Sequence, residues 1–431
     1  MRDIFLLIAI IVLMIPALRR PQVGLLAWLW ISVMNPHKLS YGFISSLPIL
    51  DGIAAVTLFS CLIHWKERAT SDFDGILKLL LIFYLWCTLT TIFAVNFSLS
   101  LTDWIEFTKT LILVVFLLLF MNKKHWILAC FGVFILSVGF VGFKGGVFTV
   151  LTGGGSRVWG APGTAWGDNN GVSVAMLMVI PITLALLAFF VKKWQKFGVS
   201  GVALSFFAAL LGTQSRGGLV GLLGMAFFAV MRSRKKLVYL VTVLLFLGIG
   251  YSFMPESWHQ RMATIQTYEE DESASTRIIQ WKYAIDISLE RPFFGNGFDA
   301  FFHKPYYYRY VADKDANRSV HSNYFQVLGE QGYIGLFMYL LLMAMMIYKA
   351  KKYALACEGR EDLAWASALL FAIQFSIIGY AANGLTVNMA YLDLYYYLLT
   401  FGVLLISYIK RELAKQPEAI KIQNSVNNNR V

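Results

Sequence analysis

The chain has 431 residues, of which 14% are charged, 58% hydrophobic and 16% aromatic. About a quarter of the residues in soluble domains are charged, so this composition excludes a water-soluble globular protein. The mean hydropathy is +0.62, and a membrane-crossing helix needs about 20 apolar residues. The chain is therefore long enough for a dozen such helices and one extramembrane segment.

The formal net charge of +12 comes mostly from Lys and Arg in short gaps between apolar segments. Short loops rich in these residues stay cytoplasmic, so the charge indicates membrane orientation and not nucleic acid as a partner. Lys410 and Arg411 directly follow the last apolar segment. Counting back from them, we expect the gaps 144–170 and 254–331 to face the periplasm. The pattern predicts a multi-pass protein of the bacterial inner (cytoplasmic) membrane.

Thirteen apolar segments follow one another, and the first two are short for a full crossing. We predict an all-α polytopic membrane protein with about 12 transmembrane helices and one large, mostly helical periplasmic loop. The expected divisions are N-terminal transmembrane helices (1–143), a short Gly-rich periplasmic loop (144–170), central transmembrane helices (171–253), a large periplasmic loop domain (254–331), C-terminal transmembrane helices (332–409) and a cytoplasmic tail (410–431).

Three charged residues, Asp103, Glu106 and Lys109, recur at intervals of three near the start of one apolar segment. This spacing predicts a single helical face. We interpret them as an ion pair that faces the bundle. A pocket acid or a proton relay is the alternative, because ionisable groups at membrane depth are functional candidates.

The short Gly-rich loop carries Lys144, Arg157, Trp159 and Asp168. Arginine can bind phosphate oxygens in a bidentate way, and tryptophan either stacks on sugars or lies at the membrane interface. Asp168 comes directly before an apolar segment, so it is a candidate ligand contact or the N-cap of the next helix. The loop predicts a binding surface for a phosphate-bearing saccharide.

Arg216 stands in the sequence Thr213–Gly218 (TQSRGG), between two apolar segments on the expected periplasmic side. The orientation rule disfavours positive charge there, and a helix begins at this point, so its amides and the guanidinium could bind one anion. A topology-setting arginine is the alternative. We predict that Arg216 binds an anionic substrate group.

The large loop is expected to contain two helices, Ser275–Glu290 and Ser319–Gln331, with a glycine-rich turn at Phe293–Phe298. Arg277 lies at the start of the first helix, where the alternative is a solvated side chain. His321 lies at the start of the second, where the loop returns to the bilayer. Histidine is well suited to act as a general base near neutral pH, although a structural role is the alternative.

The sequence has no zinc-ligand pair at the usual spacing, no P-loop and no dinucleotide fingerprint. We therefore predict neither a metal nor a cofactor, and we expect any chemistry to depend on arginines and a histidine.

Five short motifs in this order resemble the O-antigen ligase superfamily, which also holds O-antigen polymerases and protein O-oligosaccharyltransferases. The resemblance covers roughly residues 140–405, and the segment Leu151–Gly160 (LTGGGSRVWG) is similar to the O-glycosylation-ligase branch associated with exosortase systems. The motifs are Ser215-Arg216-Gly217, Thr276-Arg277-x3-Trp281-x2-Ala284, Pro292-x2-Gly295-x-Gly297, His321-Ser322-Asn323 and Gly329-x2-Gly332.

The resemblance implies transfer of a glycan from undecaprenyl pyrophosphate to a lipid A–core sugar hydroxyl at a periplasmic active site, among membrane lipids. It also implies a metal-independent, inverting mechanism, with the essential arginine and histidine roles on Arg216, Arg277 and His321. Arginines in place of a cation suit a pyrophosphate leaving group. The expected substrate-binding residues are Lys144, Arg157, Trp159, Asp168, Asn323, Tyr324 and Gln326.

Three other functions stay open at this point. An O-antigen polymerase or a protein O-oligosaccharyltransferase would use the same donor with a different acceptor. A secondary transporter or flippase would show repeated halves and charged residues near the membrane midplane, and the sequence shows no such repeat.

Overall fold

The computed structural model describes residues 2–40, 42–69, 74–233, 235–256, 258–259, 272–311 and 319–428, and these residues contain helices and no strand. The predicted all-α class is confirmed. The α-helices are α1 (Arg2–Arg19), α2 (Pro21–Met34), α3 (Ile49–Ile63), α4 (Gly75–Ile92), α5 (Phe97–Phe120), α6 (Lys124–Leu151), α7 (Asn169–Ala185), α8 (Lys193–Gly212), α9 (Arg216–Arg232), α10 (Lys236–Phe253), α12 (Glu272–Glu290), α13 (Lys304–Tyr307), α14 (Asn323–Leu355), α15 (Ala364–Asn383) and α16 (Asp393–Asn428). Short 3₁₀ helices are η1 (Phe43–Ser46), η2 (Trp65–Glu67), η3 (Leu186–Ala188), η4 (Ala300–Phe302) and η6 (Glu361–Leu363).

Among the described residues, seven helical segments are long and apolar enough to cross a membrane, so the chain is a multi-pass membrane protein. The expected number of about 12 is not confirmed. α9 has only 17 residues, α5 carries three charged side chains, and the apolar helices α2 and α3 are shorter than a full crossing. The seven are Gly75–Ile92, Lys124–Leu151, Asn169–Ala188, Lys193–Gly212, Lys236–Phe253, Asn323–Leu355 and Glu361–Asn383.

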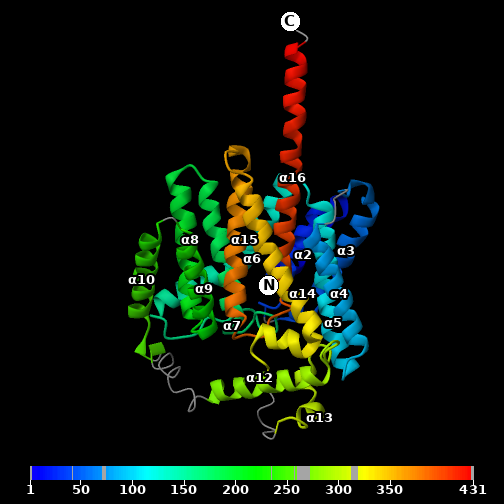
Figure 1. Ribbon diagram of the computed structural model, residues 1–431, viewed down its shortest axis with the longest axis vertical. Coiled ribbons are helices and arrows are strands. Elements are labelled where there is room, and N and C mark those ends of the chain that lie inside the picture. Colours follow the sequence, from blue (N-terminus) through cyan, green and yellow to red (C-terminus); the bar gives the residue numbers. More distant parts are fainter. Residues whose placement is uncertain are drawn as a thin grey trace.

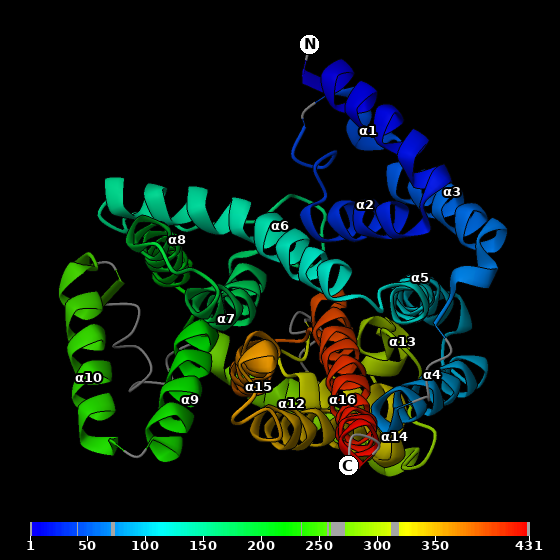
Figure 2. The same cartoon turned by 90° about the horizontal axis from the view of Figure 1, so that it is seen from above.

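The helices form a bundle with α12 and α13 across the end opposite the C-terminus (Figure 1). Seen from above, α1, α2 and α3 make one corner, and α8, α9 and α10 make another (Figure 2). α7 packs against α6, α8, α9 and α15, and most of its side chains are buried. α10 lies at the outer edge with most of its described side chains exposed, as expected for an apolar helix that faces lipid.

The ends of α6 and α16 lie beyond those expected from the sequence. α6 continues to Leu151, so the first eight residues of the expected loop 144–170 are helical. The glycines at 145 and 146 allow α8 to pack closely against α6. A Cβ on Gly146 would lie 2.0 Å from the Ser205 carbonyl oxygen. α16 continues beyond the expected span into the tail, as far as Asn428.

The glycine-rich turn joins the loop domain to the bundle. Gly295 and Gly332 both have positive φ, and a Cβ on Gly295 would lie 2.5 Å from the Glu330 carbonyl oxygen. The Gly297 amide donates to that carbonyl at 2.8 Å, and the Tyr333 amide donates to the Pro292 carbonyl at 2.9 Å. The turn thus fits against a bend in α14 that only glycine allows.

Candidate functional site

The start of α9 is a capped turn that presents Arg216. Gln214 has φ 52, Ser215 is the N-cap and its Oγ accepts from the Gly218 amide at 3.2 Å, and Arg216 is the first helical residue. The capping serine takes one of the free amides of the first turn, and the helix N-terminus favours a nearby anion. Arg216 is half-buried at this positive end.

Side chains from α7 hold this turn in place. Ser215 Oγ donates to Asn170 Oδ1 at 2.8 Å, and Asn169 Nδ2 donates to the Thr213 carbonyl at 2.9 Å. Gln214 Nε2 donates to the Gly154 carbonyl at 2.9 Å. The turn is therefore fixed from two sides, by the start of α7 and by the loop 152–168.

Gly217 brings α9 against the end of α15. A Cβ at this position would lie 2.2 Å from Thr386 Oγ1 and 3.0 Å from Asn383 Oδ1. No side chain fits there without displacing the segment that follows α15. The glycine after Arg216 is thus explained by close packing.

His321 lies in the irregular segment that precedes α14. Its φ is 48, and its Nε2 is 3.1 Å from Ser319 Oγ. The Asn323 amide donates to the Gly384 carbonyl at 2.8 Å, and Asn323 Oδ1 accepts from the Met389 amide at 2.6 Å. The expected second helix is confirmed, but it begins at Asn323 because His321 has a left-handed backbone.

α12, which carries Arg277, contacts the same segment through Trp281. The expected helix Ser275–Glu290 is confirmed, with its start at Glu272. Trp281 lies one turn after Arg277 on the same face. Its Nε1 donates to the Val320 carbonyl at 3.0 Å, and its ring stacks on Phe325 with centroids 5.2 Å apart.

These contacts connect four distant parts of the sequence. The start of α9 and the segment 319–326 both contact residues 383–390, and α12 contacts the segment 319–326. We call this region the junction: the start of α9, α12 around Arg277, the segment 319–326 and residues 383–390. Two guanidinium groups and a helix N-terminus can bind an anion, and the imidazole of His321 can accept a proton.

Several expected substrate contacts have structural partners. Asp168 caps α7, with its Oδ1 accepting from the Gly171 amide at 2.7 Å. Asn323 Oδ1 is bonded to Met389, and the Tyr324 hydroxyl donates to the Ala381 carbonyl at 2.5 Å. Gln326 Oε1 accepts from the Ala390 amide at 3.2 Å. Asn323, Tyr324 and Gln326 hold residues 381–390 in position.

A cavity of about 440 Å³ adjoins the junction through Gln326 and Met389. Its volume lies in the range of about 300–1,000 Å³ typical of small-molecule sites. We call it the acidic cavity, since its charged lining is mostly carboxylate. Its lining includes five charged side chains and one glutamine amide: Asp103, Glu106, Lys109, Asp299, Asp393 and Gln326.

Asp103 and Asp299 face each other in the acidic cavity and share a hydrogen bond. Burial raises the pKa of Asp299 above its usual range, and the bond from Asp103 offsets part of this rise. Two adjacent carboxylates repel each other, so the pair favours one shared proton. No motif marks Asp299, which reaches the cavity through the turn at Phe298 and Asp299.

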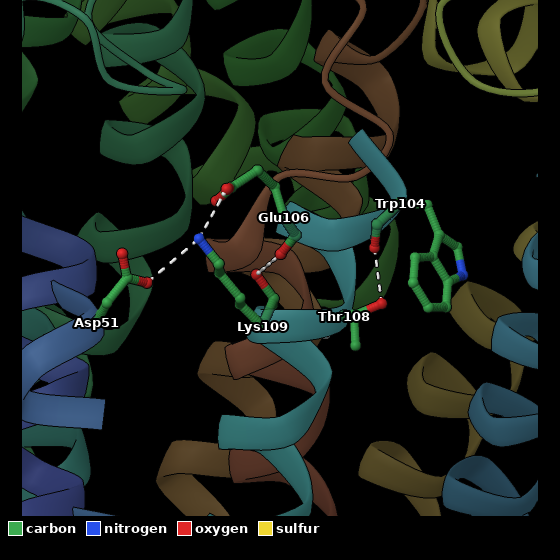
Figure 3. A network of polar contacts seen from close by, with 6 residues as sticks. Asp51, Trp104, Glu106, Thr108 and Lys109 are labelled. Atoms are coloured by element: carbon green, nitrogen blue, oxygen red, sulfur yellow. Dashed lines mark hydrogen bonds and ion pairs between the residues drawn. The ribbon is translucent and has the colours of Figure 1, made fainter. Parts of the chain in front are cut away.

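The expected ion pair on α5 is confirmed, and it includes a third residue. Lys109 Nζ lies 2.9 Å from Glu106 Oε1 and 3.2 Å from Asp51 Oδ1 on α3, and Figure 3 shows the lysine between the two carboxylates. Asp103 does not join this network and bonds to Asp299 instead.

A second cavity, of about 400 Å³, contains Lys144, Arg157 and Trp159. Arg2 and Lys38 also line it, which the sequence analysis missed because they come from separate segments with no motif. We call it the basic cavity. No residue of the junction is among its lining residues, so the expected binding residues of the chain divide between two places.

The loop 152–168 separates the two cavities. Its residues 157–160 line the basic cavity and its residues 163–165 line the acidic cavity. The Gly160 amide bonds to the Gly167 carbonyl at 2.9 Å and closes the loop on itself. The Val158 amide donates to the Gly212 carbonyl at 3.0 Å, which ties the loop to the end of α8.

Within the described part of the chain, no group of three or more His, Cys, Asp or Glu side chains is placed to hold a metal ion. The four carboxylates of the acidic cavity therefore do not form a ligand set.

Two family profiles match the chain. Residues 200–340 match the O-antigen ligase family, and residues 1–196 match a family of unknown function (DUF5935). The comparison with curated proteins finds no match. The resemblance to the O-antigen ligase superfamily is confirmed, while the exosortase-associated branch stays a prediction.

Proposed function

We propose that this chain, which carries the O-antigen ligase domain in residues 200–340, transfers a glycan from undecaprenyl pyrophosphate to a sugar hydroxyl of lipid A–core. The family supports a membrane glycosyltransferase of the ligase or polymerase type. The donor, the acceptor and the residue roles are our proposal. The observation that supports it is that the start of α9 and the segment 319–326 both contact residues 383–390, and that α12 contacts the segment 319–326.

In this proposal Arg216 and Arg277 bind the pyrophosphate of the donor. The diphosphate gains negative charge as its bond to the sugar breaks, and paired guanidinium donors stabilise that charge. The amides at the start of α9 add positive potential from the same direction. No metal is required for this stabilisation, and the group that leaves is undecaprenyl pyrophosphate.

His321 acts as the general base in the same step. Its imidazole accepts the proton of the acceptor hydroxyl as that oxygen attacks the anomeric carbon. The new carbon–oxygen bond forms while the bond to the phosphate oxygen breaks, so the configuration inverts. A base in hydrogen-bond reach contributes about 10²–10⁴ in rate. Ser319 Oγ, 3.1 Å from Nε2, positions the ring.

We place in the acidic cavity the sugar residues that adjoin the new glycosidic bond. Carboxylate and amide oxygens accept hydrogen bonds from sugar hydroxyls, and Asp103, Asp299 and Gln326 all line the cavity. Asn323 and Tyr324 act as positioning residues, because their bonds fix residues 381–390 beside it.

We assign the junction to the periplasmic face of the inner membrane. Arg232 and Lys236, at the end of α9 and the start of α10, lie at the other end of these helices from Arg216. Basic residues between spans stay cytoplasmic, so the start of α9 faces the periplasm, where the loop domain also lies (Figure 1).

The test uses the full chain, purified in detergent, with an undecaprenyl-pyrophosphate glycan. One reaction receives lipid A–core, a second a pilin-like protein and a third a free O-chain acceptor. We expect transfer to lipid A–core that continues in EDTA. Transfer only to the protein or only to the O-chain would instead identify an oligosaccharyltransferase or a polymerase, and loss of turnover in EDTA would contradict the arginine mechanism.

A further inference from the structure

The basic cavity collects positive charge from four separate segments. Arg2 begins α1, Lys38 follows α2, Lys144 lies in α6 and Arg157 lies in the loop 152–168. None of the four forms an ion pair with a described residue. Arg2 and Lys38 donate to the backbone carbonyls of Leu39 and Ser45, each at 2.9 Å. Both partners are neutral, and the carboxylate of Asp3, adjacent to Arg2 in the sequence, accepts from Ser40 Oγ.

The position of this charge conflicts with the orientation rule. The Val158 amide bonds to the Gly212 carbonyl at 3.0 Å, which places the loop at the end of the bundle where α9 begins. In the proposed orientation this is the periplasmic end, where Lys and Arg are disfavoured. Membrane topology does not explain a group of cations without ion pairs on that side. Binding of an anionic ligand does explain it.

The other wall of the cavity is apolar. Phe140 and Phe148 of α6 line the cavity and are 46% and 41% exposed, and Trp159 at its rim is 57% exposed. Exposed aromatic side chains next to cations match an amphiphile, with the chains along α6 and a charged head at the rim.

We propose that the basic cavity binds the phosphorylated headgroup of the lipid acceptor, a site distinct from that of the donor pyrophosphate. This inference rests on the proposed function for the identity of the lipid. Arg216 and Arg277 already supply the donor's diphosphate with cations, and neither lines this cavity. Four further cations suit a second phosphate-bearing substrate, and Lys144 and Arg157 are both exposed.

The loop 152–168 gives the two cavities a shared wall. In this arrangement the phosphates of the lipid bind at residues 157–160. Its sugars then extend along the loop toward residues 163–165, which line the acidic cavity. The phosphates anchor the acceptor, and the hydroxyl that reacts is presented beside Gln326 and the junction. Specificity for a phosphorylated lipid would thus come from the N-terminal half of the chain.

The test measures binding of lipid A–core to the full chain in phosphatidylcholine nanodiscs, with an enzymatically dephosphorylated lipid A–core as the matched ligand. The double variant Lys144→Gln/Arg157→Gln removes two charge-assisted contacts, so we expect Kd to rise by about tenfold or more. Arg157→Lys keeps the charge and tests whether bidentate contact matters. Lys193→Gln, an exposed cation at the start of α8, is the control and should bind as the unaltered chain does.

Three results would overturn this inference: equal affinity for the dephosphorylated lipid, unchanged Kd in the double variant, or competition by phosphatidylglycerol at equal concentration. Transfer kinetics separate the two proposals. If the lipid binds through the cavity but is not glycosylated, the proposed function fails and the binding site stands. If transfer occurs with an unchanged KM for the lipid in the double variant, the cavity assignment fails and the function stands.

Discussion

The junction and the basic cavity both place cations at the same end of the bundle, but they hold them differently. At the junction, half-buried Arg216 begins a capped helix, and the neighbouring Gly217 packs directly against Thr386. In the basic cavity, Lys144 and Arg157 are exposed on a rim beside aromatic side chains. Fixed charges suit a transition state, since preorganised groups need not rearrange. Exposed flexible charges suit capture of a ligand.

The division also follows the two family matches. The junction residues Arg216, Arg277 and His321 lie in the O-antigen ligase match, and Arg2, Lys38, Lys144 and Arg157 lie in the match of unknown function. The difference suggests that chemistry and lipid recognition are carried by different halves of the chain. The variants that follow test whether catalysis and lipid binding depend on these different residues.

The largest effect is expected from His321→Ala. Loss of the base should lower kcat by about 10²–10⁴, while binding of the donor and of lipid A–core stays close to that of the unaltered chain. Ser319→Ala, which removes the hydroxyl 3.1 Å from Nε2, should cause a smaller loss. Near-normal transfer by His321→Ala in vitro would contradict the assignment of His321 as the base. It would also contradict the assignment of catalysis to the junction.

Arg277→Lys should have the next largest effect. Lysine keeps the charge but cannot bind phosphate in a bidentate way, so kcat/KM for the donor should fall by roughly ten- to a hundredfold. Lys282→Gln, an exposed residue on the same helix, is the matched control and should be unaffected. A change in KM for lipid A–core instead of the donor would place Arg277 with the acceptor and contradict the division.

Gly217→Ala tests whether close packing fixes Arg216. The added Cβ would lie 2.2 Å from Thr386 Oγ1, and overpacking of this kind costs about 1–3 kcal/mol. We expect a lower Tm together with weaker donor binding. Gly132→Ala, in α6 with open space around the new Cβ, should keep both. Unchanged donor binding in Gly217→Ala would show that the arginine does not depend on this contact.

The smallest effect is expected at the other end of the bundle, where stability and not activity should change. Asp74 accepts from Lys349 at 2.6 Å and from Lys410 at 3.3 Å. Burial alone would raise the pKa of Asp74, but the bonds from Lys349, the Ile76 amide and Lys410 outweigh it and lower the pKa. Asp74→Asn should reduce the free energy of unfolding by roughly 1–3 kcal/mol at pH 7 and leave kcat unchanged.

The sign of the pH dependence follows from the lowered pKa. A carboxyl group with a lowered folded pKa stabilises the fold above its ordinary value of about 4, and this contribution is lost as the pH falls through the folded pKa. The difference in Tm between Asp74→Asn and the unaltered chain should therefore shrink below about pH 4. Asp362→Asn, in an exposed ion pair, is the control. A difference that grows at low pH would contradict the assignment.

The sequence by itself determined the fold class, the membrane character and the two helices of the loop domain, because hydropathy and helical spacing act locally. It also marked Arg216, Arg277 and His321 through their motifs. Only the tertiary structure decided which of these groups meet. Asp299 reaches Asp103 through the turn after Phe298, and Arg2 and Lys38 join Lys144 and Arg157 from two other segments. Contacts between residues more than a hundred positions apart depend on helix packing, which no local pattern encodes.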